Sequence, residues 1–199
     1  MGIAETTGYE YAVAQEPLIP AEGGGDRGFV LEQKHSLLVV VLDVLGHGEK
    51  ASRLASECET FLRQRPAEDP CLILQALHEH IRKSRGAAVT AASVDRESGN
   101  TSYAAVGNIC ARLFGVHHKR LVNQDGVVGY RMPTVRSRTF TLSRGGVFLV
   151  YTDGIREHFH EDDYPGMRDD KIQVVADEIM RRFGKGTDDA CCCVLRRQK

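Results

Sequence analysis

Residues 37–48 read Leu-Leu-Val-Val-Val-Leu-Asp-Val-Leu-Gly-His-Gly, and this stretch decides the fold. Six apolar residues, three of them β-branched, form the short continuous run that is typical of a buried β-strand. Asp43 closes the run, and a turn with two glycines follows. A carboxylate at the end of a buried strand is costly to desolvate unless a cation or a donor compensates it, so Asp43 is predicted to be functional. The alternative is that Asp43 caps the next helix, although helical spacing begins only several residues later.

The bulk composition predicts one globular domain over residues 1–199. This length is enough for one substantial core and short for two. Hydrophobic residues make up 42% and charged residues 27% of the chain, which argues against disorder. The net charge of −1 gives no electrostatic reason to expect a nucleic-acid or membrane partner. We also expect no membrane span and no signal peptide, because no apolar run is long enough and the first residues lack a basic and an apolar region.

The six cysteines show neither a C-x-x-C pair nor the spacing of a disulfide framework. Three of them are consecutive, at residues 191–193. In a strand, Cys191 and Cys193 would face one side and Cys192 the other, each as a small buried hydrophobe. This usage predicts a reducing, cytoplasmic setting.

The other expected elements are grouped by type along the chain. The alternation at residues 9–15 predicts the first strand, and the strands at 87–94, 101–106 and 109–116 predict an antiparallel meander. Further strands are expected at 29–32, 37–42, 135–142, 147–152 and 190–195, and helices at 47–65, 70–84 and 172–183. Strands, two helices, more strands and one helix indicate an α+β fold, because a doubly wound sheet would alternate strand and helix regularly.

Acidic residues recur where expected strands end or glycine turns begin. They are Asp26, Asp43, Asp153 and the pair Asp188-Asp189. For the glycine turn that precedes Asp26, a plain flexible connection is an equally good interpretation. Oxygen ligands gathered from separate strands suit a hard octahedral cation such as Mg²⁺ or Mn²⁺. With one bridging carboxylate, such a set predicts two ions that activate a water molecule between them.

Five short motifs, in order along the chain, resemble those of PPM-type protein serine/threonine phosphatases in the bacterial SpoIIE and RsbU branch. Residues 43–48 resemble the Asp-Gly-x-Gly-His-Gly motif, and residues 151–155 resemble the Ser/Thr-Asp-Gly motif. The other three are Gly25-Asp26 for the early Gly-Asp, residues 105–108 for the Val-Gly-Asp/Asn turn, and residues 188–195 for the closing Asp-Asp/Asn-x-Thr strand.

The resemblance implies an αββα sandwich, in which two antiparallel sheets are flanked by helices and metals lie at one edge between the sheets. Asp43 would bridge two Mn²⁺ or Mg²⁺ ions, and Val44 would lend its backbone carbonyl to one of them. Asp26 would serve that same ion, directly or through water, while Asp153 and Asp188 would hold the other. Asp43, Asp153 and Asp188 would thus be the catalytic residues, since the activated water would attack phosphoserine or phosphothreonine directly.

The resemblance also implies partners. We expect no sensor or membrane part before the catalytic domain, and this organisation is similar to that of the stand-alone phosphatases of the stressosome. The implied substrates are phosphorylated STAS-domain stressosome proteins, RsbS- and RsbR-like, with no nucleic-acid or membrane partner. The alternative is a catalytically weak pseudophosphatase that binds phosphoproteins as a regulatory module. Retention of every expected carboxylate favours the enzyme.

Three positions depart from the family pattern. Val44 replaces the usual glycine, which we expect to be tolerated because a carbonyl ligand needs no particular side chain. Cys191 stands where threonine is common, which removes a hydroxyl that would orient the neighbouring aspartate. Residues 21–25 hold no counterpart of the phosphate-binding arginine of the animal enzymes, although Arg27 lies nearby. Substrate phosphate is therefore expected to rest mainly on metal and partner residues, with weak activity on small phosphoesters.

Adjacent residues entering a strand point to opposite faces, so only one of Asp188 and Asp189 is expected to reach a metal. The second position of the matching motif accepts asparagine as well as aspartate. We therefore assign Asp188 to the metal and Asp189 to hydrogen bonding within the turn.

Several other polar residues have two interpretations each. His47 is a candidate general acid, with a structural hydrogen bond in the turn as the alternative. The acidic stretch at residues 157–163 is expected to be a solvated loop, with an extra cation as the alternative. Arg136, Arg138 and Arg144 are expected on a solvated strand face, and steering of a phosphorylated partner is the alternative.

Overall fold

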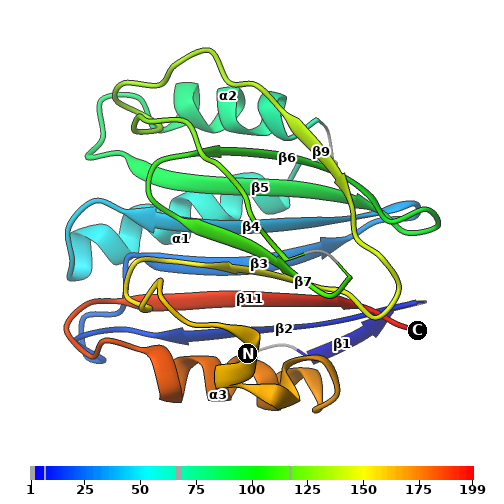
Figure 1. Ribbon diagram of the computed structural model, residues 1–199. Coiled ribbons are helices and arrows are strands. Elements are labelled where there is room, and N and C mark those ends of the chain that lie inside the picture. The colour runs from blue at the N-terminus through cyan, green and yellow to red at the C-terminus, as the bar shows by residue number, and fades with distance from the viewer. Residues whose placement is uncertain (1–2, 7, 66–68, 117) are drawn as a thin grey trace.

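The strand expected at residues 37–42 is β4 (Ser36–Val44), an inner strand of a five-stranded antiparallel sheet (Figure 1). A computed structural model describes residues 3–6, 8–65, 69–116 and 118–199. The order of this sheet is β3 (Asp26–Glu32), β4, β5 (Ala87–Asp95), β6 (Asn100–Val106) and β9 (Arg138–Thr141). The expected strand at 135–142 is thus shortened to residues 138–141.

The second sheet has six strands, all paired antiparallel. Its order is β1 (Ile3–Thr6), β2 (Tyr9–Glu16), β11 (Ala190–Arg197), β10 (Val147–Tyr151), β7 (Cys110–Phe114) and β8 (Lys119–Arg120). The strand predicted at residues 9–15 is confirmed as β2, but it is not the first strand, because β1 precedes it and pairs with it. Four residues, two of them polar, are too short a segment to show a period.

The predicted meander over residues 87–116 is also wrong in part. β5 and β6 pair as expected, but β7 joins the other sheet beside β10. The chain crosses between the sheets at Gly107 and Asn108. Gly107 has φ 103°, and a Cβ there would clash with the Cβ of Ala88. Short strands separated by turns look the same in sequence whether the turn closes a hairpin or changes sheet, so alternation alone could not separate the two.

The two sheets pack face to face, and β4 is buried on both of its faces. Val39 and Val41 face the other sheet, where they meet Val150 and Cys193. The alternate residues of β4 lie under the helices, and all side chains from residue 37 to 42 are at most 1% exposed. Each such side chain contributes roughly 1.5–3 kcal/mol of burial free energy. Burial on both faces explains why the run is continuous instead of alternating.

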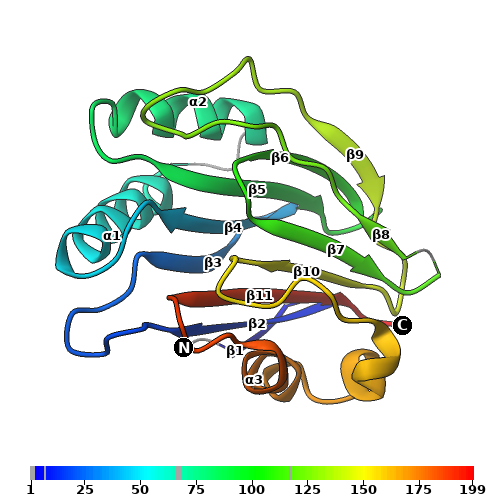
Figure 2. The ribbon, with the colours of Figure 1, turned by 60° about the vertical axis from the view of Figure 1, so that its left-hand side comes forward.

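Helices cover the outer faces of the sandwich (Figure 2). The helices α1 (Glu49–Arg63) and α2 (Pro70–His80) pack on the five-stranded sheet, and α3 (Ile172–Phe183) packs on the six-stranded sheet. Two 3₁₀ turns, η1 (Glu161–Asp163) and η2 (Pro165–Arg168), precede α3. This arrangement is the expected αββα sandwich. No helix in the described part of the chain is long and apolar enough to cross a membrane.

The expected alternation in β11 is confirmed. Cys191 and Cys193 lie in the core between the sheets, and Cys192 lies in the core under α3. The predicted helix at 70–84 is four residues too long, because α2 ends at His80 and Lys83 adopts φ 67° in the following turn. Ile81 is buried and continues the apolar spacing beyond the end of the helix, so the spacing predicts a longer helix than the structure has.

Candidate metal centre

Asp26 and Asp43 are directly opposite each other in the register of β3 and β4. Both belong to the set of alternate residues that faces the second sheet, because a Cβ on Gly28 would contact Cys191 of that sheet and Val41 lies in the core between the sheets. Asp26 is 5% exposed and Asp43 is half-buried. Two like charges directly opposite in a sheet are destabilising, so this pair is retained at a cost in stability.

The electrostatics of the pair reflect crowding by other acids. Burial, followed by repulsion from Asp43, raises the pKa of Asp26 to about 8. Burial, followed by repulsion from Asp153 and Asp188, raises the pKa of Asp43 to about 6. The Oδ2 atom of Asp26 is buried and has no hydrogen-bond partner in the described part of the chain. A cation between these carboxylates would relieve both the repulsion and the desolvation.

Asp153 follows the end of β10, which is fastened to β11. Thr152 is buried, and its hydroxyl oxygen accepts a 2.9 Å hydrogen bond from the backbone amide of Cys191. The half-buried carboxylate of Asp153 accepts a 2.9 Å hydrogen bond at Oδ2 from the side-chain amide of Asn108. Asp153 is therefore held from a turn that connects the two sheets.

Asp188 and Asp189 differ sharply in environment. Asp188 is exposed, and its Oδ1 atom accepts a 2.9 Å bond from the backbone amide of Asp189. Asp189 is 5% exposed, and its two carboxylate oxygens accept backbone hydrogen bonds of 2.8 Å from Leu18 and 2.7 Å from Gly25. The expectation that Asp189 bonds within its own turn is wrong. Its partners lie in the loop before β3, and it fastens that loop to the start of β11.

The backbone carbonyl of Val44 lies next to the same loop. The amide of Val44 donates a 3.2 Å hydrogen bond to the carbonyl of Gly25. A Cβ on Gly25 would come within 3.2 Å of the Val44 carbonyl oxygen and 3.1 Å of the Cβ of Ala51, so a side chain here would crowd both neighbours. Gly25, which precedes Asp26, is thereby hydrogen-bonded to Val44, which follows Asp43.

The donor set consists of carboxylates and one backbone carbonyl, which suits Mg²⁺ or Mn²⁺. The buried, unpartnered oxygen of Asp26 and the raised pKa values of Asp26 and Asp43 fit a cation at this position. Within the described ranges, no three His, Cys, Asp or Glu side chains already converge as a ligand shell. For these acids to hold a cation, their side chains would have to turn toward a common point.

The remaining candidates are less closely tied to the acids. His47 is exposed, and its side chain makes no hydrogen bond to the described residues. In the acidic stretch, Glu157 pairs with Arg120 at 2.9 Å and Glu161 pairs with Arg168, so these carboxylates already have basic partners. Arg136 and Arg138 are exposed.

Sequence reasoning missed Asn123. Its side-chain amide donates to the carbonyl of Gly107 at 3.0 Å and to that of Ile109, and its Oδ1 atom accepts a 2.6 Å bond from the hydroxyl of Tyr103. Asn123 thus brackets the turn that presents Asn108. No sequence signal marks it, because it lies in an irregular segment 16 residues beyond Gly107.

Comparison with known proteins gives both a family and a set of similar structures. Residues 33–198 match the family model of Stage II sporulation protein E (SpoIIE). A protein solved in a study of the bacterial stressosome, a modular system adapted to control secondary messenger signaling, superposes with a TM-score of 0.87 at 24% identity. That match covers 94% of this chain and 99% of the other.

RsbX in complex with magnesium superposes with a TM-score of 0.81 at 19% identity, over 98% of each chain. The phosphatase domain of SpoIIE from Bacillus subtilis, solved with a fragment of its regulatory domain, gives a TM-score of 0.73 at 17% identity, over 96% of this chain and 64% of that one. Identities at this level establish the fold, and the family model covers most of the chain. The protein therefore belongs to the SpoIIE family.

Proposed function

We propose that this protein is a metal-dependent protein serine/threonine phosphatase, a phosphoric monoester hydrolase formed by a single domain over residues 1–199. The observation that carries the proposal is the mutual repulsion of Asp26, Asp43, Asp153 and Asp188 at one end of the sandwich. A pure binding module has no use for carboxylates that repel one another, since they lower its stability.

In this proposal Asp43 would help to hold both of two Mn²⁺ or Mg²⁺ ions. The carbonyl of Val44 and the carboxylate of Asp26 would hold one ion, and Asp153 and Asp188 would hold the other. When bound, such ions lower the pKa of a water molecule that attacks phosphoserine or phosphothreonine without a covalent enzyme intermediate. The chain's own contribution is to fix the acids. Asn108 orients Asp153, and Asp189 orders the loop that carries Asp26, each through the hydrogen bonds described above.

For the substrate, we propose phosphorylated STAS-domain stressosome proteins, RsbS- and RsbR-like, so that the enzyme provides negative feedback in stress signalling. The likeness to RsbX and to a protein from a stressosome study supports this choice. The proposal includes a reducing, cytoplasmic setting, which the six free thiols support.

The test is a mass-spectrometric time course of phosphate loss from phosphorylated STAS-domain proteins. We expect hydrolysis with Mn²⁺ or Mg²⁺, none after chelation, and little with Asp43→Asn. Protein that binds Mn²⁺ and the phosphoprotein but leaves the phosphate in place would identify a pseudophosphatase instead.

A further inference from the structure

We propose that Arg27 is a positioning residue that holds the backbone of the metal-site loop at residues 24–26 and is not a ligand of substrate phosphate. The proposal rests on the proposed function for its kinetic consequences, but its structural part can be tested in metal-free protein. The arginine that follows Asp26 could either support the backbone of the loop or bind the substrate phosphate, and the contacts of Arg27 favour support.

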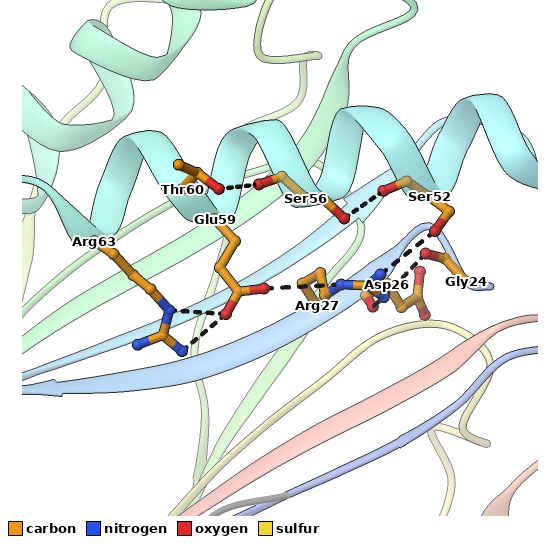
Figure 3. Close-up of polar contacts among 8 residues, drawn as sticks. All are labelled: Gly24, Asp26, Arg27, Ser52, Ser56, Glu59, Thr60 and Arg63. Carbon is orange, nitrogen blue, oxygen red and sulfur yellow. Dashed lines mark hydrogen bonds and ion pairs between the residues drawn. The ribbon is translucent and has the colours of Figure 1, made fainter.

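Arg27 and Asp26 are neighbours in β3, so their side chains leave opposite faces of the sheet. Asp26 faces the gap between the sheets, while Arg27 faces α1 on the outside, as Figure 3 shows. A phosphate at the carboxylate cluster would therefore lie on the other side of β3 from the guanidinium group.

The strongest contacts of Arg27 are with the backbone. Its Nη1 atom donates a 3.0 Å hydrogen bond to the carbonyl of Gly24 and a 2.9 Å hydrogen bond to the carbonyl of Asp26 (Figure 3). These two carbonyls bracket Gly25. Hydrogen bonds from a charged donor are stronger than neutral ones, so one nitrogen fixes the peptide groups on either side of the Gly25–Asp26 peptide bond.

Helix α1 holds the guanidinium group in place. Nη2 lies 3.5 Å from the hydroxyl of Ser52, and Nε lies 3.8 Å from the carboxylate of Glu59. Glu59 is itself fixed by Arg63 at 2.8 Å, and Arg63 stacks over the ring of Phe29 at 4.8 Å. The side chain of Arg27 is only 21% exposed, so its charge and donors are largely committed to the protein.

The loop needs this restraint because it is built from glycine. Residues 23–25 have no side chains to limit the backbone, and ordering them costs more conformational entropy than ordering other residues. On one side the carboxylate of Asp189 accepts the amide of Gly25 at 2.7 Å. On the other side Arg27 donates to the carbonyls of Gly24 and Asp26, the residues before and after Gly25. Together the side chains of Asp189 and Arg27 fix the backbone that leads into Asp26.

The experiment compares Arg27→Met, Arg27→Lys and the control Arg63→Met. The control removes the same charge from the same cluster without touching the loop. Calorimetry gives the Mn²⁺ dissociation constant, hydrogen exchange gives protection of the Gly25 amide with and without metal, and phosphoprotein kinetics give kcat and KM. Thermal unfolding shows whether each variant folds, and Arg27→Lys serves as the test if Arg27→Met does not.

We expect Arg27→Met to weaken Mn²⁺ binding about tenfold, the size typical of lost support for a metal ligand. The Gly25 amide should exchange faster even without metal, kcat should fall, and KM should stay unchanged. Arg27→Lys should recover part of each loss, because an ammonium group can still donate to one carbonyl. Arg63→Met should resemble the wild type.

Two results would overturn the inference. One is a raised KM and weaker inhibition by inorganic phosphate in Arg27→Met, with Mn²⁺ affinity and Gly25 protection unchanged, as a phosphate ligand requires. The other is an equal loss in Arg63→Met, which would assign the effect to surface charge on α1. A wild-type protein that neither binds Mn²⁺ nor hydrolyses phosphoprotein would refute the proposed function alone, because exchange at Gly25 still tests the role of Arg27.

Discussion

Asn108 donates a 2.9 Å hydrogen bond from its side-chain amide to Oδ2 of Asp153, and this bond joins the point where the chain changes sheet to the end of β10. A neutral amide at this place orients the acid without adding another negative charge to the cluster. In the proposed metal site, the other carboxylate oxygen of Asp153 would be the ligand.

Replacement of Asn108 by alanine is therefore expected to weaken metal binding more than folding. Loss of a hydrogen bond that orients a metal ligand typically costs roughly 10–100-fold in affinity. Because Asn108 is exposed, its removal leaves no buried polar group without a partner. Mn²⁺ titration calorimetry and urea unfolding on the same variant measure the two effects. A variant with full Mn²⁺ affinity would show that Asp153 needs no support from this turn.

Asn123→Ala should instead lower stability. The substitution removes both hydrogen bonds to the 107–109 turn and leaves the hydroxyl of Tyr103 without its acceptor. An unsatisfied buried polar group costs about 1–3 kcal/mol, which urea unfolding should detect. Asn100→Ala is the matched control, because Asn100 makes an exposed bond to Thr141 at the edge of the sheet and its loss should cost little.

Asp188→Asn and Asp189→Asn are expected to have opposite signatures. Asp188 is exposed and bonds only within its turn, so its amide variant should fold normally, bind Mn²⁺ weakly and lose activity by orders of magnitude. An amide at position 189 would offer one acceptor to two backbone donors. Asp189→Asn should therefore lose about 1–3 kcal/mol of stability and much less activity. Greater damage to catalysis from Asp189→Asn, in a paired assay of folded protein, would reverse the assignment of ligands.

The raised pKa values of the buried acids predict how the metal-free protein responds to pH. Asp26 and Asp43 bind protons more tightly in the folded than in the unfolded state, with folded pKa values of about 8 and about 6. The folded state therefore holds more protons than the unfolded state between about pH 4 and about pH 8, and its stability falls as the pH rises across this range. Asp43→Asn should abolish most activity while making metal-free protein more stable near pH 8, by on the order of 1 kcal/mol. Urea unfolding in chelator at low and high pH measures this, and a metal-free wild type whose stability does not fall with pH would contradict it.

Much of the fold could be predicted because the decisive signals are local. The run before Asp43 is buried on both faces, and the thiols of Cys191 and Cys192 alternate between two cores as a strand requires. The acids of the candidate site could be picked out because each follows a strand or a glycine turn. Whether these acids lie near one another depends only on which ends of the strands lie together in the fold.

What escaped prediction depends on contacts between distant parts of the chain. Asp189 bonds to the amide of Leu18, 171 positions earlier, and no short-range pattern specifies that partner. After the turn at Gly107 the chain enters the other sheet, where β7 pairs with β10. That pairing partner exists only in the assembled sandwich, so the local sequence does not specify it. Arg27 is next to Asp26 in sequence, but adjacent strand residues face opposite sides of a sheet, so its contacts with α1 depend on where the helix packs.

Alkylation of the three consecutive thiols of β11 can show the order in which parts of the sandwich separate during unfolding. All three are fully buried, and burial raises the pKa of Cys191 well above its usual range, so almost no thiolate is present for an alkylating reagent. Labelling of Cys192 reports separation of α3 from its sheet, whereas labelling of Cys191 and Cys193 reports separation of the two sheets. Mass-resolved alkylation of unmodified protein can therefore time the detachment of a helix and the parting of the sheets in one sample.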